Sequence, residues 1–372
     1  MDNHADALAT LSDCVKRAAA ARTPLRIRGG GTKDFYGQSL HGEILETAVL
    51  AGVHSYEPSE LVVTVGAGTS LVALEALLAE QGQCLPFEPP HFGAAGSNAT
   101  VGGMVASGLS GPARASAGAV RDYVLGLQLI NGKGEHLTFG GQVMKNVAGY
   151  DVSRLMAGAM GTLGLLTQVS LKVLPVAPLE ATLRFECTQG QALQRLNAWG
   201  GQPLPLNASC WLEEDGIGTL YLRLRGAKAA VEAACKTLAA AGGELKDNVA
   251  ADWQACRDQQ LPWFAARDAA QDLWRLSVPQ TAPVLDLPEP PLIEWHGALR
   301  WVRAGAGQAQ RLREVAASVG GHATLFRTSS GTGPDVPRFD ALRPPLDRIH
   351  RQLKHEFDPA GVFNPGRMYA GM

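Results

Sequence analysis

Residues 24–33, PLRIRGGGTK, decide how this chain is expected to fold. Residues 25–28 alternate apolar and basic side chains, which predicts a strand. Three glycines follow, and because glycine weakens strands and helices, such a run indicates backbone that turns tightly or lies close to another group. Consecutive amides in this turn would face a phosphate, and Thr32 would add a hydroxyl donor. Taken alone, such a stretch is more often a plain glycine turn than a phosphate site.

Two further glycine-rich stretches lie in the same half of the chain. Of 43 glycines, 16 fall between Gly93 and Gly164. Residues 99–108, ATVGGMVASG, predict a short buried helix over 101–107, whose N-terminus would accept a phosphate or a flat ring. Residues 158–164, GAMGTLG, precede a predicted strand over 164–174. Three such elements in one half indicate a large ligand wrapped by several loops, such as a dinucleotide.

Two common nucleotide motifs do not match. A Rossmann site needs G-x-G-x-x-G at a strand-to-helix turn, but Asp34 stands where the third glycine is required. A P-loop needs four residues between its glycines, whereas Gly126 and Gly132 are separated by five and Lys133 is followed by glycine. The spacing therefore favours neither NAD on a Rossmann sheet nor ATP on a P-loop.

Composition limits the class of protein. The 372 residues are 46% hydrophobic and 18% charged, which predicts two folded domains. A net charge of −2 gives no electrostatic case for nucleic acid, and no apolar run reaches the ~20 residues of a membrane span. The N-terminus lacks a secretory signal, so we expect a cytoplasmic protein. Six cysteines without a C-x-x-C pair disfavour an iron–sulfur cluster or structural zinc, and no metal is predicted.

The chain changes character after the glycine-rich half. All seven tryptophans lie at or after Trp199, and they are expected to fill a second core rather than an interface. Residues 175–178, PVAP, are a natural linker. The pattern predicts an α+β protein with domains at 1–176, 177–330 and a C-terminal helix and tail at 331–372. Predicted helices span 5–21, 71–81, 192–199, 227–241, 308–319 and 345–357, and the second region alternates them with antiparallel strands.

The order of the three glycine motifs resembles the FAD-binding domain of the vanillyl-alcohol oxidase and D-lactate dehydrogenase (PCMH) family. Residues 108–114 (GLSGPAR), 120–126 (VRDYVLG) and 145–151 (KNVAGYD) narrow the resemblance to the smaller FAD-binding subunits of bacterial glycolate oxidases. The tail at 363–367, FNPGR, matches the ending of this group. The similarity is strong over 20–175 and the last fifteen residues. It implies a two-subdomain FAD-binding domain, a smaller antiparallel α+β cap domain, and an FAD-dependent oxidoreductase.

The resemblance also implies roles for individual positions. Gly29 to Lys33 would hold the pyrophosphate, Ser107 and Gly108 would approach the isoalloxazine, and Gly161 to Leu163 would offer backbone to the ribose and adenine. Relatives with covalent flavin carry histidine at the place of Gly31, so non-covalent FAD is expected. The implied cofactor contacts are Arg28, Gly29, Gly30, Gly31, Thr32, Lys33, Pro90, Thr100, Val101, Gly102, Gly103, Ser107, Gly108, Gly111, Arg121, Gly158, Gly161, Thr162, Leu163 and Gly164.

Four residues are candidates for the flavin edge or the substrate: Lys145, Asn146, Tyr150 and Arg114. Turn and helix-capping chemistry explains the first three equally well, and an ion pair near Asp122 is an alternative for Arg121. Catalytic relatives carry paired histidines and a glutamate in the second domain. Here His296 and His322 are isolated in sequence, and His350 and His355 are five apart, so no catalytic base is assigned.

The resemblance implies a flavoprotein subunit that relays electrons, or that supports a larger catalytic FAD subunit, with an iron–sulfur subunit as the other partner. Two alternatives remain open. One is a self-sufficient FAD oxidoreductase acting on a small alcohol or hydroxy acid. The other is a structural partner that has lost its flavin, although the intact glycine loops argue against it.

Overall fold

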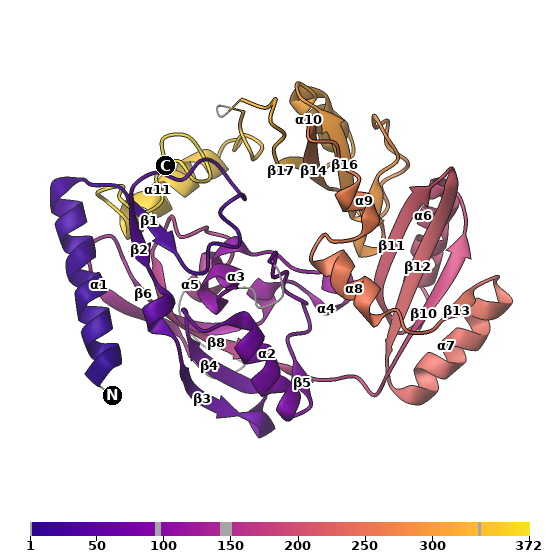
Figure 1. Ribbon diagram of the computed structural model, residues 1–372, viewed down its shortest axis with the longest axis horizontal. Helices are drawn as coiled ribbons and strands as arrows, with labels where there is room; N and C mark the ends of the chain where they lie inside the picture. Colours follow the sequence, from indigo (N-terminus) through magenta and orange to yellow (C-terminus); the bar gives the residue numbers. More distant parts are fainter. Residues whose placement is uncertain (1, 94–97, 142–150, 334–335) are drawn as a thin grey trace.

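The computed structural model describes residues 2–93, 98–141, 151–333 and 336–372, and Figure 1 shows them as two lobes. The N-terminal lobe contains α1 (Asp2–Ala21), β1 (Leu25–Arg28), β2 (Glu43–Glu46), β3 (Val53–Glu57), β4 (Val62–Gly66), α2 (Leu71–Glu80), β5 (Gln83–Cys84), α3 (Val101–Ser107), α4 (Arg114–Ala117), β6 (Val124–Ile130), β7 (His136–Gly140), α5 (Val152–Met156), β8 (Leu165–Lys172) and β9 (Leu174–Pro175). No helix in these ranges is long and apolar enough to cross a membrane.

An antiparallel five-stranded sheet, ordered β3-β4-β8-β6-β7, forms the centre of the N-terminal lobe. Leu71 of α2 and Met104 of α3 pack with Val63 and Val169 of this sheet in one buried cluster. A separate parallel pair, β1-β2, carries the first glycine loop at the end of β1. The core therefore fixes α3 close to the sheet, while the glycine loop projects from its own small pair of strands.

The cap is an eight-stranded antiparallel sheet, ordered β13-β10-β12-β11-β15-β16-β14-β17. Its elements are β10 (Leu179–Glu186), α6 (Gln189–Gly200), β11 (Leu206–Glu214), β12 (Ile217–Gly226), α7 (Lys228–Ala240), β13 (Glu244–Lys246), α8 (Ala250–Arg257), α9 (Pro262–Ala265), β14 (Gln271–Ser277), β15 (Leu292–Glu294), β16 (Leu299–Gly305), α10 (Ala309–Ser318) and β17 (His322–Arg327). The predicted α+β class with an antiparallel cap is confirmed. The cap tryptophans fill core positions, as expected: Trp274, Trp295 and Trp301 are all buried.

The C-terminal segment returns to the first lobe, where Figure 1 shows α11 (Leu346–Phe357) near β1. Buried Lys354 donates hydrogen bonds to Thr162 O (2.8 Å), Asp358 Oδ2 (2.7 Å) and Phe363 O (2.7 Å). This ammonium thus ties the third glycine stretch to the FNPGR tail. The predicted domain limits after residues 176 and 330 fall in the connections following β9 and β17, and they stay predictions.

Several local predictions are confirmed and others are corrected. The helix over 101–107 and the strand over 25–28 have the expected limits, and β6 and β7 form the expected hairpin. The single strand expected over 164–174 is wrong, because it divides into β8 and β9, and β9 pairs with β5 instead. Strand β2 and helix α8 were not predicted.

Candidate cofactor site

A cavity of about 100 Å³ lies where the first two glycine stretches meet. Its lining includes much of the predicted pyrophosphate site together with the tail: Arg28, Gly29, Gly30, Gly31, Thr32, Lys33, Asp34, Tyr36, Thr100, Gly103, Ser107, Met160, Asn364 and Arg367. Residues more than 300 positions apart in sequence therefore share one wall. The predicted residues Val101, Gly102, Thr162, Leu163 and Gly164 do not line it.

Close backbone approach explains the glycine at position 30. A Cβ there would lie 1.5 Å from Asn98 O, so no side chain fits against the loop that precedes α3. Thr100 begins α3 by accepting a hydrogen bond from Gly103 N at 3.2 Å. At Gly103, by contrast, a Cβ would meet only Thr100 Oγ1, at 3.2 Å. Gly103 therefore leaves open a space on the cavity wall that a larger side chain would fill.

The arginines at this cavity have acidic or backbone partners, whereas Lys33 donates, among the described residues, only to the hydroxyl of Thr32, at 3.3 Å. Asp34 Oδ2 accepts from Arg26 Nη2 (2.5 Å) and Arg28 Nε (3.1 Å). Arg367 donates to Lys33 O and Asp34 O at 3.2 and 3.0 Å, and burial lowers the pKa of this guanidinium to about 10. Burial also lowers the pKa of Lys33 to about 8, although the carboxylate of Asp258 raises it. The arginines at this end are thus held in place by their partners, and Lys33 keeps a positive charge below about pH 8.

The FNPGR tail (residues 363–367) contacts β1, the first glycine loop and the third glycine stretch. Asn364 Oδ1 accepts from Ile27 N at 2.9 Å, and its amide donates to Met160 O at 2.7 Å. One side chain therefore links β1 to the third glycine stretch. Gly161 lies beside it, because a Cβ on that residue would be 2.7 Å from Asn364 Nδ2. Gly161 thus supports the tail rather than lining the cavity.

A second cavity, of about 350 Å³, continues from the first through the shared residues Tyr36, Ser107 and Met160. Gly108, Gly158, Arg114 and Arg121 from the predicted set line it. Its wall adds residues that sequence reasoning missed: Arg275, Ser277, Trp295 and His322 of the cap, and Phe339 of the C-terminal segment. The two adjacent cavities lie between the glycine loop and the cap, and together we call them the channel below.

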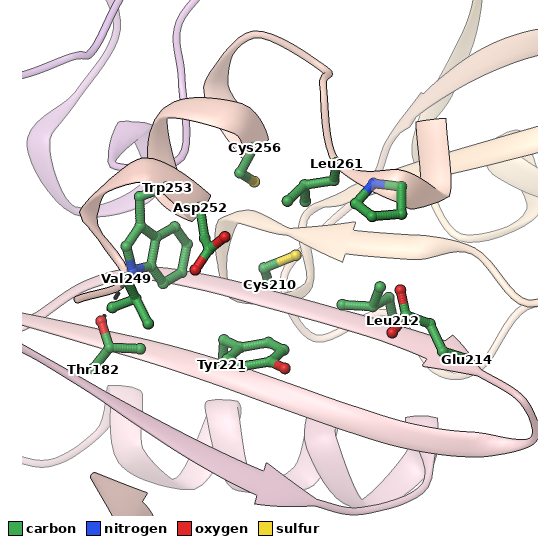
Figure 2. A pocket seen from close by; sticks show the side chains of 11 residues that line it. Thr182, Cys210, Leu212, Glu214, Tyr221, Val249, Asp252, Trp253, Cys256 and Leu261 are labelled. Atoms are coloured by element: carbon green, nitrogen blue, oxygen red, sulfur yellow. Dashed lines mark hydrogen bonds between the residues drawn. The ribbon is translucent and has the colours of Figure 1, made fainter. Parts of the chain in front are cut away.

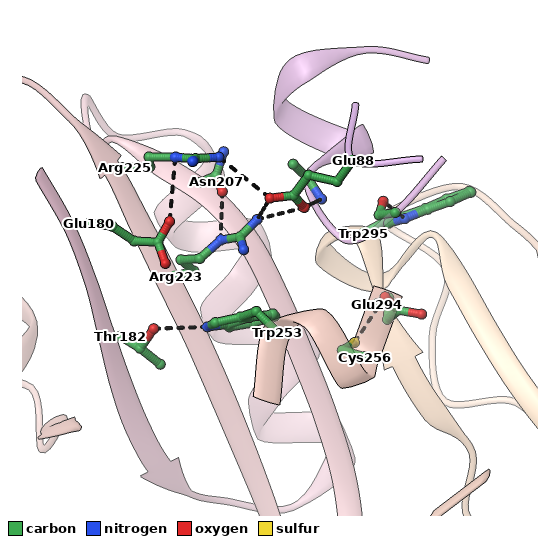
Figure 3. Close-up of polar contacts among 12 residues, drawn as sticks. Glu88, Glu180, Thr182, Asn207, Arg223, Arg225, Trp253, Cys256, Glu294 and Trp295 are labelled. Atoms are coloured by element: carbon green, nitrogen blue, oxygen red, sulfur yellow. Dashed lines mark hydrogen bonds and ion pairs between the residues drawn. The ribbon is translucent and has the colours of Figure 1, made fainter. Parts of the chain in front are cut away.

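Glu88 of the N-terminal lobe binds arginines of the cap sheet, as Figure 3 shows. Glu88 accepts from Arg223 Nη2 at 2.6 and 2.8 Å, from Arg225 Nη1 at 3.4 Å, and from Ala113 N at 3.1 Å. The Trp295 indole donates from the cap side to Gly111 O at 2.9 Å. These contacts fix the segment before Arg114 against the cap sheet. Gly111 and Pro90 line the small gap behind Trp295, not the channel.

Another cavity, of about 240 Å³, lies beneath α8 on the cap sheet (Figure 2) and shares no lining residue with the channel. Cys210, Tyr221, Asp252 and Trp253 point into it. Cys256, at its edge, contacts Glu294 Oε1 at 3.3 Å, and burial raises the pKa of Glu294 to about 7. The predicted residues Lys145, Asn146 and Tyr150 lie outside the described residues.

The signal for the missed residues is weak but present. Arg275 and Ser277 alternate with Trp274 and Leu276 along β14, so a period of two places them on one face of the strand. The sequence alone does not show that this face meets Tyr36. Arg367 belongs to the tail motif, but its contact with the first loop depends on the return of α11. No group of three or more His, Cys, Asp or Glu side chains suited to a metal occurs in the described ranges.

Comparison with known proteins agrees with this geometry. Residues 4–140 match the model of the family described as "FAD binding domain". The chain is 47% identical over 361 residues to glycolate oxidase subunit GlcE of Escherichia coli (strain K12), covering 97% of both chains. The chain belongs to the GlcE family. It is therefore a member of an FAD-linked oxidoreductase family.

More distant relatives either match a smaller part of this chain or share only its fold. Glycolate oxidase subunit GlcD of Bacillus subtilis (strain 168) is 31% identical over 164 residues, which are 44% of this chain and 34% of that protein. An alkyldihydroxyacetonephosphate synthase structure superposes with a TM-score of 0.64 at 15% identity, covering 95% of this chain and 75% of that one. GlcE-family membership thus rests on the full-length similarity, and the solved structure supports the two-lobed fold.

Proposed function

We propose that the chain is the FAD-binding subunit of a multi-subunit glycolate oxidase. The observation that carries this is the 47% identity with GlcE over 97% of both chains, combined with the channel built from the glycine stretches. The cofactor would lie along the channel, with its pyrophosphate at Gly29 to Lys33 and its ring system toward Ser107 and Gly108. FAD accepts and passes on electrons when bound, and the protein supplies position and electrostatics.

The described residues fit such a group. Gly103 leaves an open wall, Thr32 offers a hydroxyl, and Arg28 and Lys33 supply positive charge beside the loop. Asn364 and Arg367 of the tail bind the backbone on either side of the first glycine loop. These contacts position the loop without a ligand. Gly31 provides no side chain for a covalent link, so the flavin is non-covalent. The other cofactor contacts implied by the family, including Gly161 to Gly164, stay part of this proposal.

The similar Escherichia coli protein is named as a subunit, which supports the existence of partner subunits for this chain. We expect a larger catalytic FAD subunit and an iron–sulfur subunit, with this chain relaying electrons or supporting the larger one. No base is assigned within about 3 Å of a hydroxyl proton, which oxidation of a hydroxy acid requires. The isolated chain is therefore expected to bind FAD but to oxidise glycolate and D-lactate negligibly.

Purification of the chain alone and together with its partners tests this. The pure protein should be yellow, and acid precipitation should leave all flavin in the supernatant. Dye reduction by glycolate should appear only after the two partner subunits are added. Flavin in the pellet would contradict the non-covalent mode, rapid turnover by the lone chain would favour the self-sufficient enzyme, and a colourless protein that still activates its partners would favour the structural role.

A further inference from the structure

Basic side chains predominate among the described residues that line the cap end of the channel. These described lining residues include three arginines, Arg114, Arg121 and Arg275, and no aspartate or glutamate; His322 also lines this end, but burial and the charge of Arg275 lower its pKa, which favours the neutral imidazole. The remaining wall is mostly apolar, formed by residues such as Val278, Phe339 and Met368. A cavity of this composition favours an anion with little bulk.

Two of the guanidinium groups share one indole. The Cζ atoms of Arg114 and Arg275 lie 4.5 and 5.0 Å from the centroid of Trp295. The indole is itself fixed by its hydrogen bond to Gly111 O. Arg114 comes from the N-terminal lobe and Arg275 from β14 of the cap, so the two lobes deliver like charges to the same place. Such stacking fixes the planes of both groups without neutralising them.

Neither guanidinium has a carboxylate within ion-pair distance among the described residues, and the nearest acidic influences are those of Asp122 on Arg114 and of Glu294 on Arg275. In the described ranges no ion pair within 4.0 Å involves Arg114 or Arg275, whereas Arg121 lies 3.9 Å from Asp122. Burial and the nearby charges of Arg275 and Arg121 lower the pKa of Arg114. Arg275 instead lies beside the phenol of Tyr36: burial raises the pKa of this phenol, and the charge of Arg275 opposes that rise. Partly buried cations are normally paired, so an anionic ligand would relieve the repulsion between these two.

We infer that Arg275 and Arg114 bind the carboxylate of a small 2-hydroxy or 2-oxo monocarboxylic acid at the cap end of the channel. The inference rests on the proposed function, because the flavin ring at Ser107 and Gly108 would form the opposite wall. A guanidinium offers two parallel donors that match a planar carboxylate. The acid therefore has a binding site on this subunit itself, and no chemical step is assigned to it.

Titration of the flavin-loaded protein with glyoxylate, at constant ionic strength, tests the inference. Binding should perturb the flavin absorbance saturably. R275Q and R114Q should each weaken binding about tenfold or more, because a charge-assisted hydrogen bond is lost. R275K and R114K keep the charge and should retain part of the affinity. The matched control is R311Q, since Arg311 pairs with Asp286 on the exposed surface; it should bind glyoxylate like the unmodified protein.

Flavin content and thermal melting are measured first for every variant, which separates the two proposals. If no flavin binds, the proposed function fails, and the acid site is then tested in the flavin-free protein by the fluorescence of its tryptophans. Unchanged glyoxylate affinity in folded R275Q and R114Q would overturn the inference. So would equal affinity for chloride or inorganic phosphate, since the site would then be a general anion site.

Discussion

The two ends of the channel differ in the partners of their arginine side chains. At the glycine loop, Arg26 and Arg28 share the carboxylate of Asp34, and Arg367 is held by backbone carbonyls. At the cap, Arg114 and Arg275 share only an indole. The arginines at the first end are therefore held by a carboxylate and by backbone carbonyls before any ligand arrives, with Lys33 as the cation outside this network, whereas at the second end Arg114 and Arg275 have no carboxylate within 4.0 Å among the described residues.

The difference suggests two kinds of recognition in one channel. Compensated cations and close backbone hold a resident group whose place does not change, as expected for a cofactor. Uncompensated cations on a wall contributed by two lobes suit a small anion that enters and leaves. Substitutions at the first end should therefore remove the flavin, and those at the second should spare it.

Gly103→Val should have the largest effect. Its Cβ would meet only Thr100 Oγ1, so the branched side chain projects into the open wall of the loop cavity rather than into backbone. We expect a folded protein without flavin. The measurement is flavin absorbance per protein alongside circular dichroism. Gly200→Val is the matched control, since it also lies in a helix and nothing described lies within 4 Å of its Cβ position. Full flavin content in Gly103→Val would place the cofactor elsewhere.

The glycine-loop end could be predicted from sequence because its information is local. The helix over Val101–Ser107 and the strand before Gly29 are set by apolar spacing and glycine runs within about ten residues. Close approach at Gly30 leaves a sequence signature, since only glycine fits beside Asn98 O. Short-range physical requirements of this kind are visible in the chain itself.

The cap end could not be predicted because long-range packing creates it. Arg275 stands in an ordinary alternating strand, and Trp295 in a short turn after β15, so neither has a local signal. Their meeting with Arg114 depends on the cap sheet docking through Glu88 and Gly111. Helix α8 was missed for a related reason, because its burial comes from Trp253 and Cys256 facing the sheet.

Glu88→Gln should weaken the docking of the cap. Arg223 has an almost fully buried side chain, and the substitution replaces the carboxylate that pairs with it by a neutral amide, so its positive charge is left without a counter-ion at that position. Loss of one partner of a buried pair costs about 3 kcal/mol. Urea unfolding followed by tryptophan fluorescence reports the cap directly, because every tryptophan lies at or after Trp199.

The control for this variant is Glu232→Gln, which removes an exposed pair with Lys228 and should change the free energy of unfolding by less than about 0.5 kcal/mol. Because Glu88 also accepts from Ala113 N, next to Arg114, glyoxylate binding should fall in Glu88→Gln while flavin remains. Equal loss of flavin binding and glyoxylate binding in Glu88→Gln would show that the two ends of the channel do not bind their ligands independently.

The smallest effect concerns pH at the glycine-loop end. The pKa of Lys33 is lowered to about 8 by burial, so the ammonium is charged below that pH and increasingly neutral above it. A bound pyrophosphate favours the charged form, so FAD affinity should fall as pH rises through 8, by up to about tenfold per pH unit for one linked proton. The dissociation constant of FAD measured between pH 7 and 9.5 checks this. Lys33→Arg keeps its charge throughout and should give a flat profile. A slope unchanged in Lys33→Arg would mean that another group near the loop, and not Lys33, senses the pyrophosphate.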